Sequence, residues 1–161
     1  MKAFKKALLK SVALILLFLC VTGTWFFVEF ILPVRIVCNP YLKHSAFQGD
    51  QASREKIRRA CHKILSYRIG NYHDAFIVID EVGNKESIPY LIRALKSLHQ
   101  WPLKNMDLGA TVESCSVNLK YFTGMDFGDD YEKWENWWKE TGRHLPFDEE
   151  KGQLILPEKE E

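Results

Sequence analysis

Four acidic side chains stand close together in the C-terminal third of the chain, where they could bind a cation. Asp126, Asp129, Asp130 and Glu132 surround Gly128. A calcium loop of the EF-hand type needs ligands at alternating positions, a central glycine and a glutamate at its twelfth position. Counted from Asp126, the glycine comes third and the twelfth residue is a tryptophan. The pattern therefore favours a helix cap, in which Asp129 or Asp130 accepts hydrogen bonds from the first amides of the next helix.

Three tryptophans follow this cluster, namely Trp134, Trp137 and Trp138. Together they could form an aromatic platform for a sugar or a cationic ligand. Spacings of three and four residues place two of them on one face of a helix, which is where a helix inserts side chains into a core. Core packing is the favoured interpretation, although a tryptophan at such a site often keeps its indole edge at the surface.

The histidines and cysteines lack the spacing of a metal site. No two of the five histidines fall at HxH or HxxxH spacing, and the four cysteines contain no CxxC pair. The chain also has no GxSxG motif and no glycine-rich phosphate loop. We therefore predict no catalytic residue, no metal site and no cofactor.

Cys61 and Cys115 both fall in predicted helices. They could form a disulfide if the domain faces an oxidising compartment. The favoured alternative is that each is a small, buried, apolar side chain, because free cysteine packs well in cores.

A long apolar segment precedes the part of the chain that must position these residues. From Ser11 to Val34 the only charged side chain is Glu29. These 24 residues form a helix long enough for a hydrocarbon core of roughly 30 Å. Residues 1–10 are a basic flank, and such flanks stay in the cytoplasm. The sequence thus predicts a single-pass transmembrane anchor at 11–34, with the N-terminus cytoplasmic and the domain extracytoplasmic.

Cleavage of this segment as a signal peptide is the alternative, and it would give a secreted protein. Val21, Thr22 and Gly23 offer small residues for cleavage, but the apolar run continues beyond them. An uncleaved anchor is therefore favoured. Glu29 is a candidate intramembrane polar site, although it lies near enough to the end of the run to reach the interface, where Trp25 could also sit.

Charge is divided unevenly along the chain. Residues 1–40 carry five basic side chains and one acidic side chain, whereas the remainder carries 17 basic and 20 acidic side chains. A mildly acidic domain without a clustered basic face does not match a phosphate backbone. Nucleic acid is therefore not an expected partner.

The remainder of the chain predicts helices. Residues 35–52 lack a sustained period and are expected to be a connector, after which amphipathic helices are predicted from Ser53, at about Tyr72–Val82 and at about Glu86–Leu98. Gly83 is expected to end the second of these as a left-handed cap. The first has a basic side, which could contact anionic headgroups but is better explained by solvation.

The string HDAFIVIDEVGNKESIPYLIRAL resembles a HEAT repeat of the short bacterial type. The matching features are the Asp-Ala start, the apolar-Gly-Asn turn, the Ile-Pro-x-Leu-Ile opening of the second helix and its Ala-Leu end. The resemblance covers about one repeat, from roughly Tyr72 to Leu98. It implies an antiparallel helical hairpin within a short stack of such hairpins, and a surface that binds proteins.

The string LKYFTGMDFGDDYEKWENWWKETG is similar to segments that close bacterial chains of the HEAT type. We interpret it as the C-terminal cap of the stack. The predicted fold is thus all-α, with a HEAT-like domain at 53–146 and a frayed acidic tail at 147–161. The candidate interaction surface consists of Tyr90, Arg93, Trp101, Trp134 and Trp138.

The sequence accordingly predicts a membrane-tethered helical scaffold or protein-interaction module without catalytic activity. Its partners would be the bilayer, through residues 11–34, and a protein at or near the membrane. Two alternatives stay open. The chain could be an accessory subunit or lyase-like enzyme of the HEAT-repeat class, or a structural subunit that assembles through its transmembrane helix.

Overall fold

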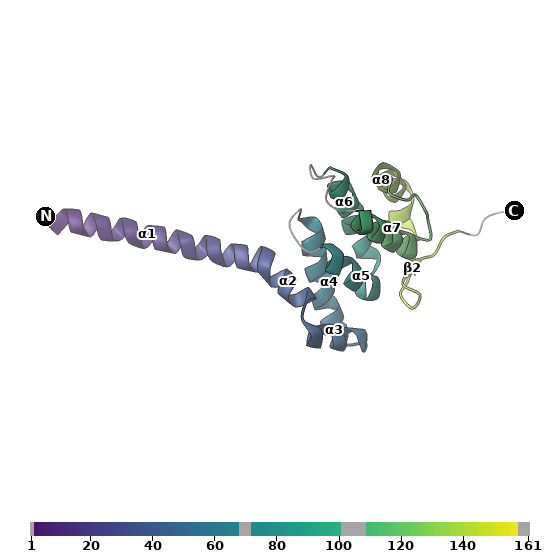
Figure 1. The fold of residues 1–161 in the computed structure, drawn as a ribbon, viewed down its shortest axis with the longest axis horizontal. Coiled ribbons are helices and arrows are strands. Elements are labelled where there is room, and N and C mark those ends of the chain that lie inside the picture. The colour runs from purple at the N-terminus through teal and green to yellow at the C-terminus, as the bar shows by residue number, and fades with distance from the viewer. Residues whose placement is uncertain (1, 68–71, 101–108, 158–161) are drawn as a thin grey trace.

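The computed structural model describes residues 2–67, 72–100 and 109–157, with side chains from residue 10 onward except at 109 and 110. The described chain is mostly helical, as predicted. A long first helix, α1, projects away from a helical domain that contains the other helices and the short strands (Figure 1).

The apolar segment forms three consecutive helical pieces. These are α1 (Lys2–Phe26), a π-helical turn η1 (Phe27–Ile31) and α2 (Leu32–Val37). The stretch Lys10–Val37 contains an 18-residue window with a mean hydropathy of 2.3, and it is long and apolar enough either to cross a membrane or to serve as a signal sequence. This helix extends past the predicted end at residue 34. Its last turns belong to the domain, because Pro33 and Val37 are buried.

The predicted connector at 35–52 is wrong, because most of it is helical. Helix α3 spans Pro40–Phe47 and α4 spans Gln51–Ser66. Asn39 caps α3 by accepting a hydrogen bond from the amide of Leu42 at 3.0 Å, and the proline at the first helical position suits that start. Asp50 caps α4 by accepting a hydrogen bond from the amide of Ser53 at 3.1 Å, so the helix begins two residues before the predicted start at Ser53.

Helix α5 spans Tyr72–Val82, as predicted, and is followed by the short 3₁₀ helix η2 (Lys85–Ser87) and by α6 (Ile88–His99). Asn84 and Ser87 cap each other's backbone at this turn. Gly83 does not adopt the expected left-handed conformation. A glycine is needed there because a Cβ would lie 2.4 Å from Cζ of Phe122 and 2.5 Å from the carbonyl oxygen of Ile79.

The C-terminal part comprises α7 (Gly109–Thr123), α8 (Tyr131–Glu140), the 3₁₀ helix η3 (Gly142–His144) and a two-stranded antiparallel hairpin. Gly124 ends α7 with a φ of 69°, and Asp130 caps α8 as predicted, through the amide of Lys133. The hairpin strands are β1 (Phe147–Asp148) and β2 (Gln153–Leu154), and Leu154 is buried in the core. The expected frayed tail is therefore wrong for this part of 147–161.

Helix packing differs in part from a simple series of hairpins. Helix α4 contacts α2, α3 and α5, while α6 contacts α4, α7 and α8. Helix α5 packs mainly on α4 and α7, so its main neighbours do not include α6, the next helix in the chain. One continuous core joins these helices, including the fully buried Phe76, Phe122 and Trp134.

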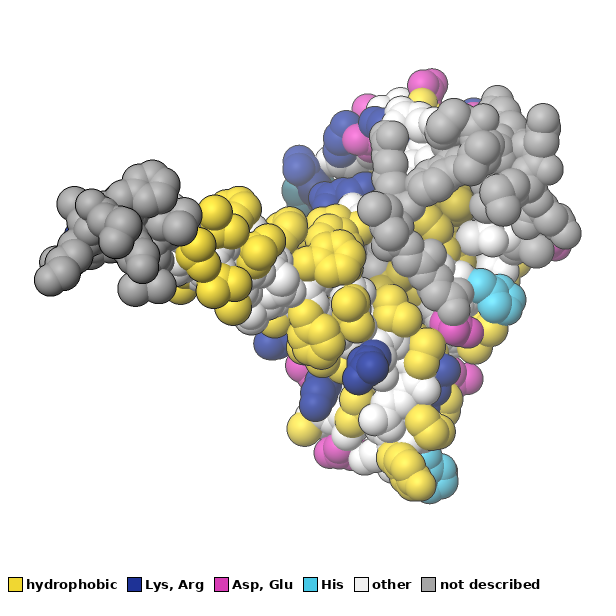
Figure 2. Space-filling model, turned by 60° about the vertical axis from the view of Figure 1, so that its left-hand side comes forward, with side chains coloured by type: hydrophobic (Ala, Val, Ile, Leu, Met, Phe, Trp, Pro, Cys, Tyr) yellow, Lys and Arg dark blue, Asp and Glu magenta, His cyan; other side chains and the backbone are white. Residues whose placement is uncertain are grey.

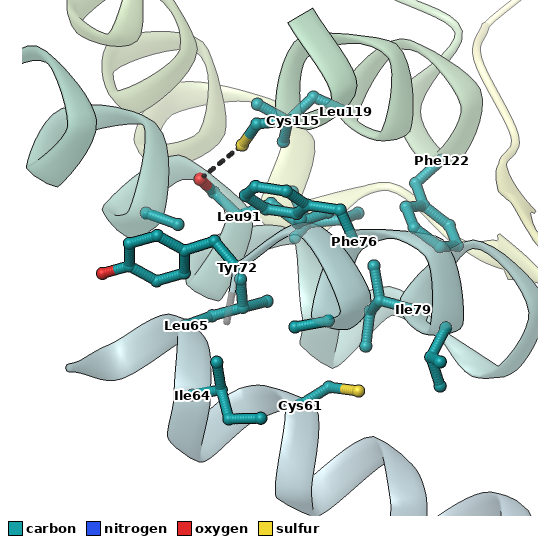
Figure 3. Packing of buried hydrophobic residues seen from close by; sticks show 14 of the residues in the cluster. Cys61, Ile64, Leu65, Tyr72, Phe76, Ile79, Leu91, Cys115, Leu119 and Phe122 are labelled. Carbon is teal, nitrogen blue, oxygen red and sulfur yellow. Dashed lines mark hydrogen bonds between the residues drawn. The ribbon is translucent and has the colours of Figure 1, made fainter. Parts of the chain in front are cut away.

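Cys61 and Cys115 are free, buried thiols rather than a disulfide. Figure 3 shows them on opposite sides of the layer that Phe76 and Ile79 of α5 contribute to the core. The Cys115 thiol instead donates to the carbonyl oxygen of Leu91 at 3.2 Å. The favoured alternative, two small buried side chains, agrees with this packing.

Candidate functional site

The charged residue of the apolar segment joins the long N-terminal helix, formed by α1 and η1, to the domain. The carboxylate of Glu29, in η1, lies 2.9 Å from Nζ of Lys63. It also accepts a hydrogen bond from the hydroxyl of Tyr67 at 3.0 Å. Both partners lie at the end of α4 or just beyond it, more than thirty residues away in the chain. The predicted intramembrane polar site is thus engaged within the chain itself.

Aromatic and electrostatic contacts reinforce this junction. The ring of Phe30 lies against that of Tyr67, with centroids 4.8 Å apart. The hydrogen bond to Glu29 raises the pKa of the Tyr67 phenol above its usual value, so the phenol stays protonated and remains a donor. Because α2 also packs along α4, the junction fixes the direction in which α1 leaves the domain.

The second candidate site is an apolar surface with an acidic edge, which we call the acidic surface. Its centre is formed by Phe47 of α3, Ile77 of α5 and Val117 of α7, which are 42%, 54% and 56% exposed. These side chains line a shallow groove of about 490 Å³. The groove is also lined by acidic side chains, namely Asp80, Glu81 and Glu113.

Sequence reasoning missed this surface because it predicted an amphipathic helix at about Tyr72–Val82 and assigned no exposed apolar side chain to it. The signal was nevertheless present in the helical spacing. Ile77 shares a face with His73, Asp80 and Glu81, and all four side chains are exposed. An isoleucine among polar residues at that spacing predicts exposure rather than burial.

The predicted interaction residues are only partly brought together. Arg93 and Trp138 line one groove between α6 and α8, of about 330 Å³, and the guanidinium of Arg93 lies 5.7 Å from the ring centroid of Tyr90. Trp134 is wrong as a surface residue, because it is fully buried and its indole donates to the carbonyl oxygen of Gly128 at 2.9 Å. Trp101 lies outside the described residues.

The acidic cluster that precedes α8 is occupied by local partners. Asp130 caps the helix, and Asp126 pairs with Lys120 at 2.7 Å. Among the described residues, no three His, Cys, Asp or Glu side chains gather as they would around a metal ion. The local contacts therefore match the helix-cap interpretation.

The buried titratable groups are held in their neutral forms. His62 stacks on Tyr90, with ring centroids 4.1 Å apart, and its Nε2 lies 2.9 Å from Oγ of Ser87. Burial lowers the pKa of His62 to about 4 and raises that of Cys61 to about 12. Burial also raises the pKa of Cys115. A neutral thiol is a poor nucleophile, so burial leaves neither cysteine activated.

Comparison with protein-family models, with curated proteins and with solved structures found no match for this chain.

Proposed function

We propose that this protein is a membrane-tethered helical interaction module, without catalytic activity of its own, that binds a protein partner through the acidic surface. The observation that carries the proposal is the cluster of three exposed apolar side chains on three different helices, edged by carboxylates. Exposed apolar patches with polar edges are typical of interaction sites.

The chemistry of the acidic surface indicates its partner. Asp80, Glu81 and Glu113 form no side-chain ion pair with the other described residues. A partner segment with apolar side chains between lysines or arginines would cover the groove and neutralise these carboxylates. We therefore propose a partner with a basic, apolar segment.

The tether restricts where this partner is found. Within the anchor helix, exposed apolar side chains continue from Val12 to Leu32, which supports an uncleaved, single-pass anchor over secretion. The basic flank supports a cytoplasmic N-terminus and an extracytoplasmic domain. The partner would then be an extracytoplasmic protein or a loop of a membrane protein on that face.

The HEAT-like stack remains our proposal for the fold family, supported by the sequence around the turn between α5 and α6. We do not propose assembly through Glu29, because Lys63 and Tyr67 already bind its carboxylate.

Site-specific crosslinking in native membranes tests the proposed function. A photoreactive phenylalanine analogue at position 77 should crosslink a partner, whereas the same analogue at position 93, in the groove of Trp138, should not. Charge reversal at Asp80 and Glu113 should abolish the crosslink from position 77. Equal crosslinking from both positions, or a crosslink that persists after charge reversal, would refute this assignment of the surface.

A further inference from the structure

A second groove lies where the anchor helix meets the domain, and we call it the junction groove. It has a volume of about 490 Å³ and runs between the end of the anchor helix and α4. Its floor is apolar and includes Val28, Leu32 and Ile36 from the anchor side. Its volume is in the range that holds small-molecule ligands.

One wall of the junction groove is basic. Lys56, Arg59 and Lys63 line it at spacings of three and four residues along α4, so they form a single row on one helix face. Figure 2 shows Lys and Arg side chains beside the apolar surface at the base of the anchor helix. This is the basic face that the sequence alone explained by solvation.

The positive charge of this row is only partly neutralised within the chain. Arg59 pairs with Glu55, which is the acidic residue of the lining, and Lys63 pairs with Glu29. Lys56 is exposed and forms no ion pair with another described residue. A net positive charge therefore remains at the groove, and guanidinium and ammonium groups both bind phosphate.

The apolar floor continues along the anchor helix. A shallow apolar groove lined by Cys20, Thr24, Trp25 and Val28 ends at the residue where the junction groove begins, since Val28 lines both. Cys20, Thr24 and Val28 are spaced four residues apart on one face of the helix. This face thus connects the apolar surface of the anchor with the basic row. Trp25 lies one turn before Glu29, and tryptophan is enriched at the level of lipid headgroups.

We propose that the junction groove binds one anionic phospholipid. Its phosphate lies against Lys56 and Arg59, and one acyl chain follows the anchor face from Val28 towards Cys20. A soluble anion would use only the basic row, whereas a phospholipid also covers the apolar floor that leads into the anchor. A bound lipid would fix the depth of the domain at the bilayer surface, because the groove includes residues of both α4 and the anchor.

Native mass spectrometry of the full chain tests this proposal. The protein is reconstituted into nanodiscs of phosphatidylcholine and phosphatidylglycerol, and the lipids retained on the released protein are counted. The wild type should retain one phosphatidylglycerol molecule. The variant K56Q/R59Q should retain about thirtyfold less, because each basic side chain near anionic lipid adds measurably to binding.

The control R93Q/K96Q removes an arginine and a lysine at the same spacing from α6, and it should retain the lipid like the wild type. The side chains of Lys56 and Arg59 are both exposed, so K56Q/R59Q should keep the wild-type circular dichroism spectrum. If it does not, K56Q alone serves as the test variant.

A third variant separates a bound lipid from diffuse attraction to an anionic surface. V28W fills the groove without changing any charge, and it should also lose the retained lipid. The proposal is overturned if V28W retains phosphatidylglycerol like the wild type, or if K56Q/R59Q and its control behave alike. It is also overturned if the wild type retains no lipid, or retains phosphatidylcholine equally well.

Discussion

Acidification should weaken the domain through His62, the buried histidine of α4. Its imidazole stacks on Tyr90 and contacts Ser87, and burial lowers its pKa from 6.5 to about 4. In the unfolded chain, the histidine has its ordinary pKa and binds a proton first as the pH falls. The free energy of unfolding therefore decreases between pH 6.5 and pH 4, and this contribution is constant above and below that window.

The size of the effect follows from the two pKa values. Integrated from pH 7.5 to pH 4.5, the difference corresponds to a loss of no more than about 2.5 kcal/mol of stability. Relaxation and water around the imidazole reduce this limit, so we expect a loss of about 1–2 kcal/mol. That is a substantial fraction of the stability of a small domain.

The assay is chemical denaturation of the full chain in a mild neutral detergent, at several pH values from 7.5 to 4.5. The matched variant is H62Q, which keeps a hydrogen-bonding side chain but does not titrate. Protonation of carboxylates at low pH destabilises both proteins equally. The difference between their two pH profiles of unfolding free energy therefore reports on His62 alone. Parallel pH profiles for wild type and H62Q would refute the reasoning.

Three further predictions concern packing and capping. G83A should lower the free energy of unfolding by about 1–3 kcal/mol, because its Cβ would overlap Phe122 and a backbone carbonyl; a loss below about 0.5 kcal/mol in denaturant titration would contradict the close approach. Cys61 and Cys115 should resist maleimide in the native protein and react only in denaturant, because both are fully buried; native labelling of either, read by peptide mass spectrometry, would show that the core opens. D130A should cost about 1 kcal/mol through loss of the α8 cap, whereas D129A, at the exposed neighbour, should leave the unfolding midpoint nearly unchanged.

The sequence predicted those elements whose signals are local. The bounds of α5 follow from periodic apolar residues and a flanking glycine. The cap at Asp130 follows from an acidic residue placed directly before an amphipathic run. The signal for α3 was also local, since Asn39 followed by a proline is a helix start, but the short segment lacked the apolar period that would have confirmed it.

The features that sequence reasoning missed depend on contacts between distant segments. Glu29 was assigned to lipid or to the interface because its partner Lys63 is 34 residues away. Gly83 was assigned a left-handed cap because Phe122, which requires the glycine, belongs to a later helix. The hairpin around Leu154 consists of two-residue strands, which are too short to show an alternating pattern.

The π-helical turn at Phe27–Ile31 sets how the domain is rotated about the axis of α1. A π turn holds one residue more than an α turn, so the helix after it is rotated by about 100° relative to a continuous α-helix. The direction in which each face of the domain points about the axis of α1 therefore depends on the number of residues in this turn. A single deletion there would rotate the domain about the axis of α1 while leaving the sequence of every other element intact.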